Sequence, residues 1–322
     1  MENIDIFNGD ADGICALLQL HLAQPEKLNN QLITGIKRDI NLLRKIPADT
    51  PALHITVLDI SLDKNRLELQ QLLDRGFSIF YADHHFAGDF PEHPNLQRHI
   101  DTKPDTCTSL IINEVLNQAF YLWAICGAYG DNMNHQAEQL CAQYHISDKN
   151  SKKLKKLGIY INYNAYGASI NDLHYAPDEL FKKLLNYSSP IDFINDSFSE
   201  FSHLQDGYQQ DMTLARQTKA TIQTQQIALY ILDDAPWARR VNGVWGNELA
   251  NQFPQRAHAV LTHSNQQNYA ISVRAPLHQR SGADELCQQF PSGGGRKAAA
   301  GINQLPKTQL DKFIQAFEAQ YS

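Results

Sequence analysis

The chain has 322 residues, 43% hydrophobic and 20% charged, which is enough apolar material for the cores of two ordinary domains. It lacks an apolar run of about 18 residues and a signal-peptide N-terminus, so we expect a cytoplasmic protein without a membrane span. Its five cysteines are scattered and never stand at CxxC spacing, so we expect them to be reduced and not in disulfides. A net charge of −7 disfavours a protein that coats long duplex nucleic acid.

The N-terminal part alternates strand-like and helix-like segments. We expect strands at 3–7, 32–36, 54–60 and 77–82, and helices at 13–22 and 62–75. This alternation predicts an α/β fold, with a parallel sheet covered by helices on both faces.

The middle of the chain is mainly helical. A helix is expected near 105–116, where Thr106, Thr108 and Ser109 mark its start. The apolar run 120–126 then leads into Asp131, and helices are expected at 136–144 and 152–163. The polar stretch 197–224 is interpreted as a helical connection.

The C-terminal part returns to a strand-rich pattern. We expect strands at 226–232, 257–262 and 269–274, with the last as a hairpin partner, and helices at 246–253, 282–289 and 307–321. The predicted domains are therefore 1–195, a helical linker at 196–224, and a smaller α/β domain at 225–322.

Acids and histidines follow several of the apolar elements. The residues concerned are Asp10, Asp12, Asp59, Asp83, His84, His85 and Asp131. Taken singly, each has a plain structural reading as a helix cap or a solvated turn residue, and for Asp10 and Asp12 alone that reading is favoured. Together they suit a pair of Mn²⁺ or Mg²⁺ ions, an arrangement that serves phosphoester hydrolysis.

The run Gly293 to Gly301 is a second candidate site. Three glycines let backbone N–H groups approach a phosphate closely, and the following Ala-rich run could start a helix whose N-terminus favours anions. Arg296, Lys297 and Arg274 would add charged donors. The alternative is a flexible loop with solvated basic residues.

These motifs resemble, in their order along the chain, those of the DHH phosphoesterase superfamily. Asp83-His84-His85 is similar to the name motif, and Gly9 to Gly13 to the first motif in its RecJ-like form. Asp59 and Asp131 are similar to the second and fourth motifs. Gly293 to Gly301 resembles the glycine-rich signature of the DHH-associated C-terminal domain.

The resemblance implies a DHH domain at 1–195, a DHH-associated domain at 225–322, substrate between them, and two Mn²⁺ ions, with Mg²⁺ as the alternative. The metal ligands it implies are Asp10, Asp12, Asp59 (as the bridge), His84 and Asp131. It implies that His85 contacts the scissile phosphate and Asp83 supports the histidines. The implied substrate-binding residues are Arg274, Gly293, Gly294, Gly295 and Arg296. The chain departs from the family pattern at Ile6 and Asn8, where other members often carry a histidine or an acid, and at Arg296, where histidine is usual.

The leading hypothesis is a Mn²⁺-dependent phosphodiesterase that cleaves short oligoribonucleotides or linear dinucleotides, of the pGpG or pApA type, to mononucleotides. The two domains without the further nucleic-acid-binding domains of RecJ-type exonucleases favour a short substrate, as does the acidic charge. One alternative is a polyphosphate or small-phosphoester hydrolase, for example of 3′-phosphoadenosine phosphate. Another is a nucleotide-binding regulatory protein with a decayed metal site. The expected partners are the substrate and, in one arrangement, a second copy in a homodimer.

Overall fold

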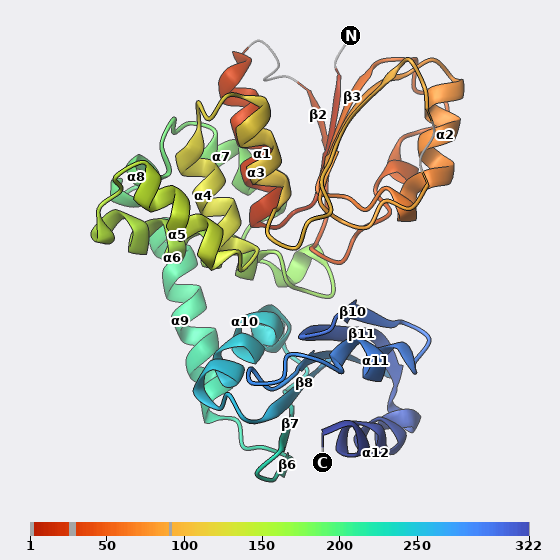
Figure 1. The fold of residues 1–322 in the computed structure, drawn as a ribbon, viewed down its shortest axis with the longest axis vertical. Helices are drawn as coiled ribbons and strands as arrows, with labels where there is room; N and C mark the ends of the chain where they lie inside the picture. Colours follow the sequence, from red (N-terminus) through yellow and green to blue (C-terminus); the bar gives the residue numbers. More distant parts are fainter. Residues whose placement is uncertain (1–2, 26–29, 90–91, 322) are drawn as a thin grey trace. The chain divides into compact units, whose positions relative to one another are not determined.

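The structure is a computed structural model that describes residues 3–25, 30–89 and 92–321. The chain divides into two compact units (Figure 1). The first comprises Met1–Ala165 with Ser169–Gln205, and the second Tyr166–Ala168 with Asp206–Ser322. The boundary falls inside helix α9 (Phe201–Gln217), which lies within the stretch predicted as the linker.

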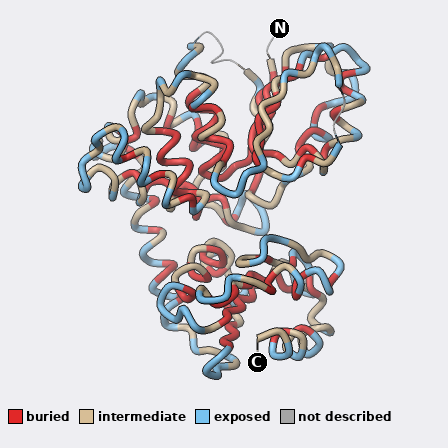
Figure 2. The backbone as a smooth tube through the Cα atoms, in the orientation of Figure 1, coloured by how far each residue is buried: buried red, intermediate tan, exposed pale blue. Residues whose placement is uncertain are grey.

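The first unit is built on a five-stranded parallel sheet of order β2-β1-β3-β4-β5. The strands are β1 (Ile4–Phe7), β2 (Gln31–Ile33), β3 (His54–Leu58), β4 (Ser78–Asp83) and β5 (Leu96–Ile100). The central strands are almost continuously apolar because helices cover both of their faces. Figure 2 shows the resulting buried strands and helix faces.

Helices cover the two faces of this sheet unequally. Helix α2 (Arg66–Asp74) lies on one face, and α1 (Ala11–Ala23), α3 (Thr108–Val115) and α4 (Tyr121–Gly130) gather on the other (Figure 1). The remaining helices of the unit are α5 (Asn134–Gln143), α6 (Asp148–Asn164), α7 (Pro177–Leu184) and α8 (Pro190–Asn195). The predicted parallel sheet with helices on both faces is thus confirmed.

The second unit contains a six-stranded mixed sheet of order β10-β11-β9-β8-β7-β6. Its strands are β6 (Ile222–Gln223), β7 (Ile227–Ile231), β8 (Ala257–His263), β9 (Asn268–Arg274), β10 (Gly293–Arg296) and β11 (Ala299–Pro306). Its helices are α10 (Pro236–Gln252), α11 (Ala283–Gln288) and α12 (Leu310–Tyr321). Strands β8 and β9 pair antiparallel, as the predicted hairpin requires.

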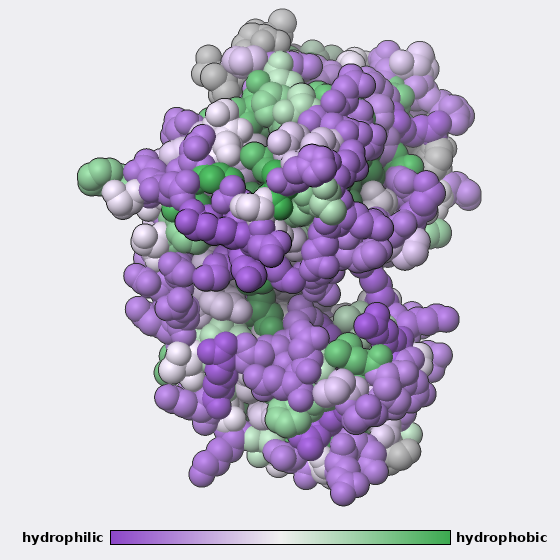
Figure 3. All heavy atoms as spheres, turned by 60° about the vertical axis from the view of Figure 1, so that its left-hand side comes forward, coloured by the Kyte–Doolittle hydropathy of each residue, from purple (hydrophilic) through white to green (hydrophobic). Residues whose placement is uncertain are grey.

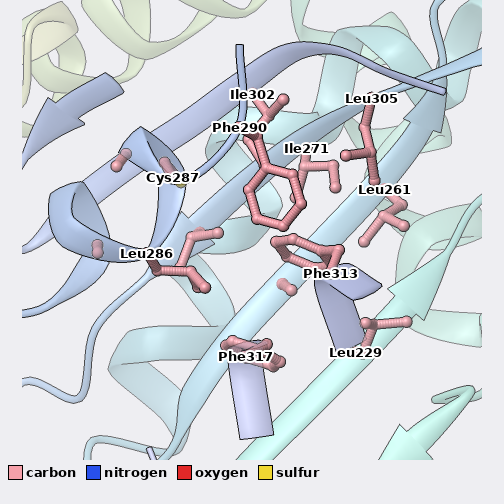
Figure 4. Close-up of a cluster of buried hydrophobic side chains, with 14 of the residues drawn as sticks. Leu229, Leu261, Ile271, Leu286, Cys287, Phe290, Ile302, Leu305, Phe313 and Phe317 are labelled. Carbon is pink, nitrogen blue, oxygen red and sulfur yellow. The ribbon is translucent and has the colours of Figure 1, made fainter. Parts of the chain in front are cut away.

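Aromatic and aliphatic side chains form the core of the second unit (Figure 4). Phe290 and Phe313 face each other over Ile271 of β9, with ring centroids 5.8 Å apart. Phe317 stacks on Phe313 one turn earlier in α12, and both side chains are completely buried in this core. Strands β9 and β11 contribute Ile271 and Ile302 to this core, and β11 pairs with β10, which carries Gly293 to Gly295.

Several elements differ from the sequence-based prediction. The Ala-rich run after Gly295 is strand β11, not the start of a helix, because pairing with both β9 and β10 outweighs the helix propensity of alanine. The edge strand β5 was missed, since its sequence is half-exposed and polar. Helix α10 begins at Pro236, ten residues before the predicted start at Gly246.

No described helix is long and apolar enough to cross a membrane. The face drawn in Figure 3 is mostly hydrophilic, with hydrophobic residues in small separate patches.

Candidate metal centre

Three neighbouring strands deliver acidic and imidazole side chains to one edge of the first unit's sheet. Strands β1, β3 and β4 are parallel and adjacent, so their carboxyl ends lie together. Asp10 and Asp59 follow the first two strands, and Asp83 ends the third. Because α1 and α2 cover opposite faces, the sheet has a topological switch point between β1 and β3, where open α/β sheets bind ligands (Figure 1).

Asp10 and Asp12 cap two helices while facing the site. Asp10 is the N-cap of α1 and accepts hydrogen bonds from the backbone N–H groups of Asp12 and Gly13, at 3.0 and 3.1 Å. Both carboxylate oxygens of Asp12 accept from the first amides of α3, those of Thr108 and Ser109, each at 2.7 Å. The capping interpretation is therefore correct, and it orients the carboxylates without using all of their lone pairs.

Asp59 is held in a backbone conformation that few residue types accept. Its φ is +59°, in the left-handed region, where Asp and Asn are the non-glycine residues best tolerated. The Thr108 hydroxyl donates to Asp59 Oδ1 at 3.1 Å, and the carboxylate is almost completely buried. A turn of this shape directs the side chain into the site instead of along the strand.

His84 lies at the centre of the carboxylates. Its Nδ1 is 3.0 Å from the carbonyl oxygen of Thr106, which fixes the proton on that nitrogen and leaves the Nε2 lone pair facing the acids. Nε2 lies 3.9, 3.6 and 3.9 Å from carboxylate oxygens of Asp12, Asp59 and Asp131, respectively. This tautomer is the one that a metal-binding imidazole needs.

Asp131 reaches the same point from a helix instead of a strand. It is the C-cap of α4, which packs closely against α1 because Gly130 has no side chain. A Cβ at that position would lie 2.3 Å from the Cβ of Ala11. Asp131 Oδ2 is buried and has no hydrogen-bond partner among the described residues, the state of a carboxylate oxygen prepared for a cation.

His85 lies beside His84, with ring centroids 4.5 Å apart, but is far more exposed. Its side chain is 42% exposed, and its Nδ1 is 2.7 Å from Oδ1 of the fully buried Asp83. Burial alone would lower the pKa of His85, but the hydrogen bond and charge of Asp83 raise it above its ordinary value. Ligand atoms of Asp59, His84 and His85 all lie within 4.8 Å of one another, so His85 could also serve as a metal ligand.

Lys37, which the sequence reasoning did not single out, also enters the site. Its ammonium forms an ion pair with Asp10, donates to Asn162 Oδ1 at 2.9 Å, and lies 3.9 Å from Asp131 Oδ1. The sequence signal for it is weak: a single lysine four residues after β2, at the same edge of the sheet.

The site carries more negative charge than its own cation neutralises. Burial, followed by the charges of Asp12 and Asp10, raises the pKa of Asp59 well above its usual value. Burial also raises the pKa of Asp131, although Lys37 opposes the change. Burial would raise the pKa of Asp10 too, but the charge of Lys37 and the hydrogen bonds from Lys37 and the Gly13 amide together lower it. Carboxylates crowded in this way, with an imidazole nitrogen among them, fit a hard divalent cation.

The predicted substrate-binding residues lie in the second unit. The guanidinium of Arg274 makes four hydrogen bonds within that unit, to the side chains of Asn247 and Ser272 and the carbonyl oxygens of Val273 and Gly243. These contacts use most of its donors, so Arg274 is already a structural element of the sheet. Its role in substrate binding stays a prediction.

The glycine run forms an edge strand instead of a loop. Gly293, Gly294, Gly295 and Arg296 make up β10, paired antiparallel with β11. Register places Arg274 opposite Ala299, and Ala299 opposite Arg296, so the two arginines share one face of the sheet. Arg296 is exposed there and available to an anion.

No family model matches the sequence, and no curated protein matches it. Solved structures do match. The DHH domain of a member of a ribosomal-protein family aligns with 99% of this chain and 86% of its own, at 14% identity and a TM-score of 0.62. Exonuclease RecJ bound to manganese aligns with 99% of this chain and 89% of its own, at 16% identity and a TM-score of 0.60. PggH, a pGpG-specific phosphodiesterase from Vibrio cholerae, aligns with 99% of this chain and 100% of its own, at 15% identity and a TM-score of 0.56.

The chain therefore has the fold of the DHH-domain proteins. The expected superfamily resemblance is confirmed at the level of fold.

Proposed function

We propose that the chain is a divalent-metal-dependent phosphodiesterase that hydrolyses short oligoribonucleotides or linear dinucleotides to nucleoside monophosphates. The observation that carries the proposal is the position of His84 Nε2, which lies within 3.9 Å of oxygens from three separate carboxylates at the strand ends. Mn²⁺ is the proposed ion and Mg²⁺ the alternative; RecJ, which has the same fold, binds manganese.

Each residue of the site has a defined part in this proposal. Asp12, Asp59, His84 and Asp131 would hold the cation, which would supply Lewis acidity toward water and the phosphate. Asp10, predicted from the sequence as a further ligand, forms an ion pair with Lys37 at the same site. The α3 amides and the Thr108 hydroxyl fix Asp12 and Asp59 before the substrate binds.

His85 is the proposed contact to the scissile phosphate. Asp83 holds its Nδ1 proton and favours the imidazolium, so the exposed Nε2–H can donate to a phosphate oxygen whose charge grows during the reaction. The side chain is accessible enough to meet a substrate, unlike the buried His84.

Two observations support a short substrate. PggH, which aligns over its whole length with this chain, is specific for pGpG. The net charge of −7 would repel a long polyanion, whereas a dinucleotide carries few phosphates. Arg296 and the backbone of β10 would bind the far phosphate or a guanine edge.

The test is hydrolysis of 5′-phosphorylated ribo-oligonucleotides, from two to about ten residues and of each base, with polyphosphate and 3′-phosphoadenosine phosphate alongside. The wild type is compared with Asp59→Asn, which keeps the left-handed turn and the Thr108 contact but loses the charge. We expect Mn²⁺-dependent release of mononucleotides, fastest from the dinucleotide, and loss of turnover in the variant.

Other outcomes separate the alternatives. Turnover that rises with chain length would indicate a general exonuclease, and turnover of polyphosphate or 3′-phosphoadenosine phosphate alone would indicate a small-phosphoester hydrolase. Nucleotide binding without metal binding or turnover would indicate a regulatory protein. Full activity of Asp59→Asn would refute the site assignment.

A further inference from the structure

We propose that the ammonium of Lys37 permanently occupies one of two neighbouring cation positions in the metal centre, so that each chain binds a single divalent ion. This inference rests on the proposed function and replaces the pair of ions predicted from sequence. In this arrangement the ammonium of Lys37 supplies the positive charge that a second metal ion would otherwise supply.

The contacts of Lys37 are those of a cation with oxygen ligands. Its Nζ meets Asp10 Oδ2 in an ion pair, Asn162 Oδ1 at 2.9 Å, and Asp131 Oδ1 at 3.9 Å. The lysine side chain is only 23% exposed, and the Asp10 side chain only 4%. A charge pair this sheltered is weakly screened by solvent.

Asp131 joins this position to the one around His84. Its Oδ1 faces Lys37 at 3.9 Å, whereas its Oδ2 faces His84 Nε2 at 3.9 Å. One carboxylate thus separates two cation positions. On the Lys37 side stand Asp10 and Asn162, and on the other side stand Asp12 and His84. Asp59 lies next to both Asp10 and His84.

Apart from Asp59, the residues around Asp10 offer little to a second divalent ion. Ile6 is apolar and completely buried. The side chain of Asn8 is used by the backbone, because it donates to the Lys37 carbonyl at 3.3 Å and accepts from the Asp10 amide at 3.2 Å. With Lys37 in place, a second dication there would meet a like charge and an incomplete ligand set.

The experiment counts bound ions. The metal-free protein is titrated with Mn²⁺ by calorimetry, and the loaded protein is examined by electron paramagnetic resonance, which distinguishes an isolated Mn²⁺ ion from an exchange-coupled pair. Lys37→Arg keeps a cation in place, Lys37→Ala removes it and opens room, and Lys45→Ala removes an exposed lysine from the same segment.

We expect one isolated Mn²⁺ per chain in the wild type, Lys37→Arg and Lys45→Ala. In Lys37→Ala we expect a second equivalent and a coupled spectrum, because Asp10, Asp131 and Asn162 lose their cation. Two ions in the wild type would overturn the inference and leave the proposed function standing, whether or not Lys37→Ala folds. One ion in both the wild type and Lys37→Ala would also overturn it. No ion in the wild type would overturn the proposed function itself.

Discussion

The first two glycines of β10 allow a sharp test of how the second unit is packed. A Cβ at Gly293 would lie 1.7 Å from the backbone carbonyl oxygen of Cys287, far inside van der Waals contact, and only a backbone shift could relieve this. At Gly294 no described heavy atom lies within 4 Å of the same position. Gly293→Ala and Gly294→Ala add the same methyl group to adjacent residues of one edge strand, so each controls for the other.

We expect Gly293→Ala to lower the free energy of unfolding by about 1–3 kcal/mol, the usual cost of overpacking a tightly packed site. Gly294→Ala should change it by less than about 0.5 kcal/mol, as surface substitutions do. Urea unfolding followed by tryptophan fluorescence measures both, since Trp237 and Trp245 lie in α10 of the same unit. Equal stability of the two variants would refute the close approach of β10 to α11.

The remaining predictions concern charge. Without metal, Asp59→Asn should be more stable than the wild type, because burial and the neighbouring carboxylates disfavour the ionised form of Asp59. Mn²⁺ at 100 times its Kd should stabilise the wild type by about 2.7 kcal/mol and leave the variant unchanged. Thermal unfolding with and without Mn²⁺ measures both effects. Burial lowers the pKa of His258 to about 4, so between about pH 4 and 6.5 the unfolded state binds more protons than the folded state. The free energy of unfolding should therefore rise with pH across this range, by up to about 3 kcal/mol in total. Urea unfolding at several pH values measures this. Asp83→Asn should lower the pKa of His85, so the alkaline limb of the kcat profile should move to lower pH.

Each of these has an outcome that contradicts it. Equal Mn²⁺ stabilisation of Asp59→Asn would place the ion elsewhere. His258→Phe removes the titrating group, and an unchanged acid dependence in that variant would assign the effect to other residues. An alkaline limb that stays in place in Asp83→Asn would show that His85 does not act as the imidazolium.

Much of the candidate metal centre could be predicted because parallel strands end at one edge of a sheet. Asp10, Asp59 and His84 follow three strands whose apolar sequences are plain, and their convergence needed only the strand order. Asp131 was predicted from its place after an apolar run, although that run lies in helix α4. Its position depends on the close helix packing at Gly130, which sequence patterns do not show.

The partners of these residues were harder to foresee. The amides that hold Asp12 are backbone groups, so nothing beyond the predicted start of α3 marks them. Lys37 follows a short strand, in a segment without regular periodicity. The sequence of the glycine run suggests a flexible loop, whereas its antiparallel pairing with β11 makes Gly293 to Arg296 a strand.

The most direct test of the metal centre is an anomalous difference map from a crystal of the protein grown with Mn²⁺. We predict a peak bounded by the side chains of Asp12, Asp59, His84 and Asp131. No peak at that edge of the sheet, or a peak coordinated by other residues, would contradict the assignment of the strand-end cluster as the metal centre.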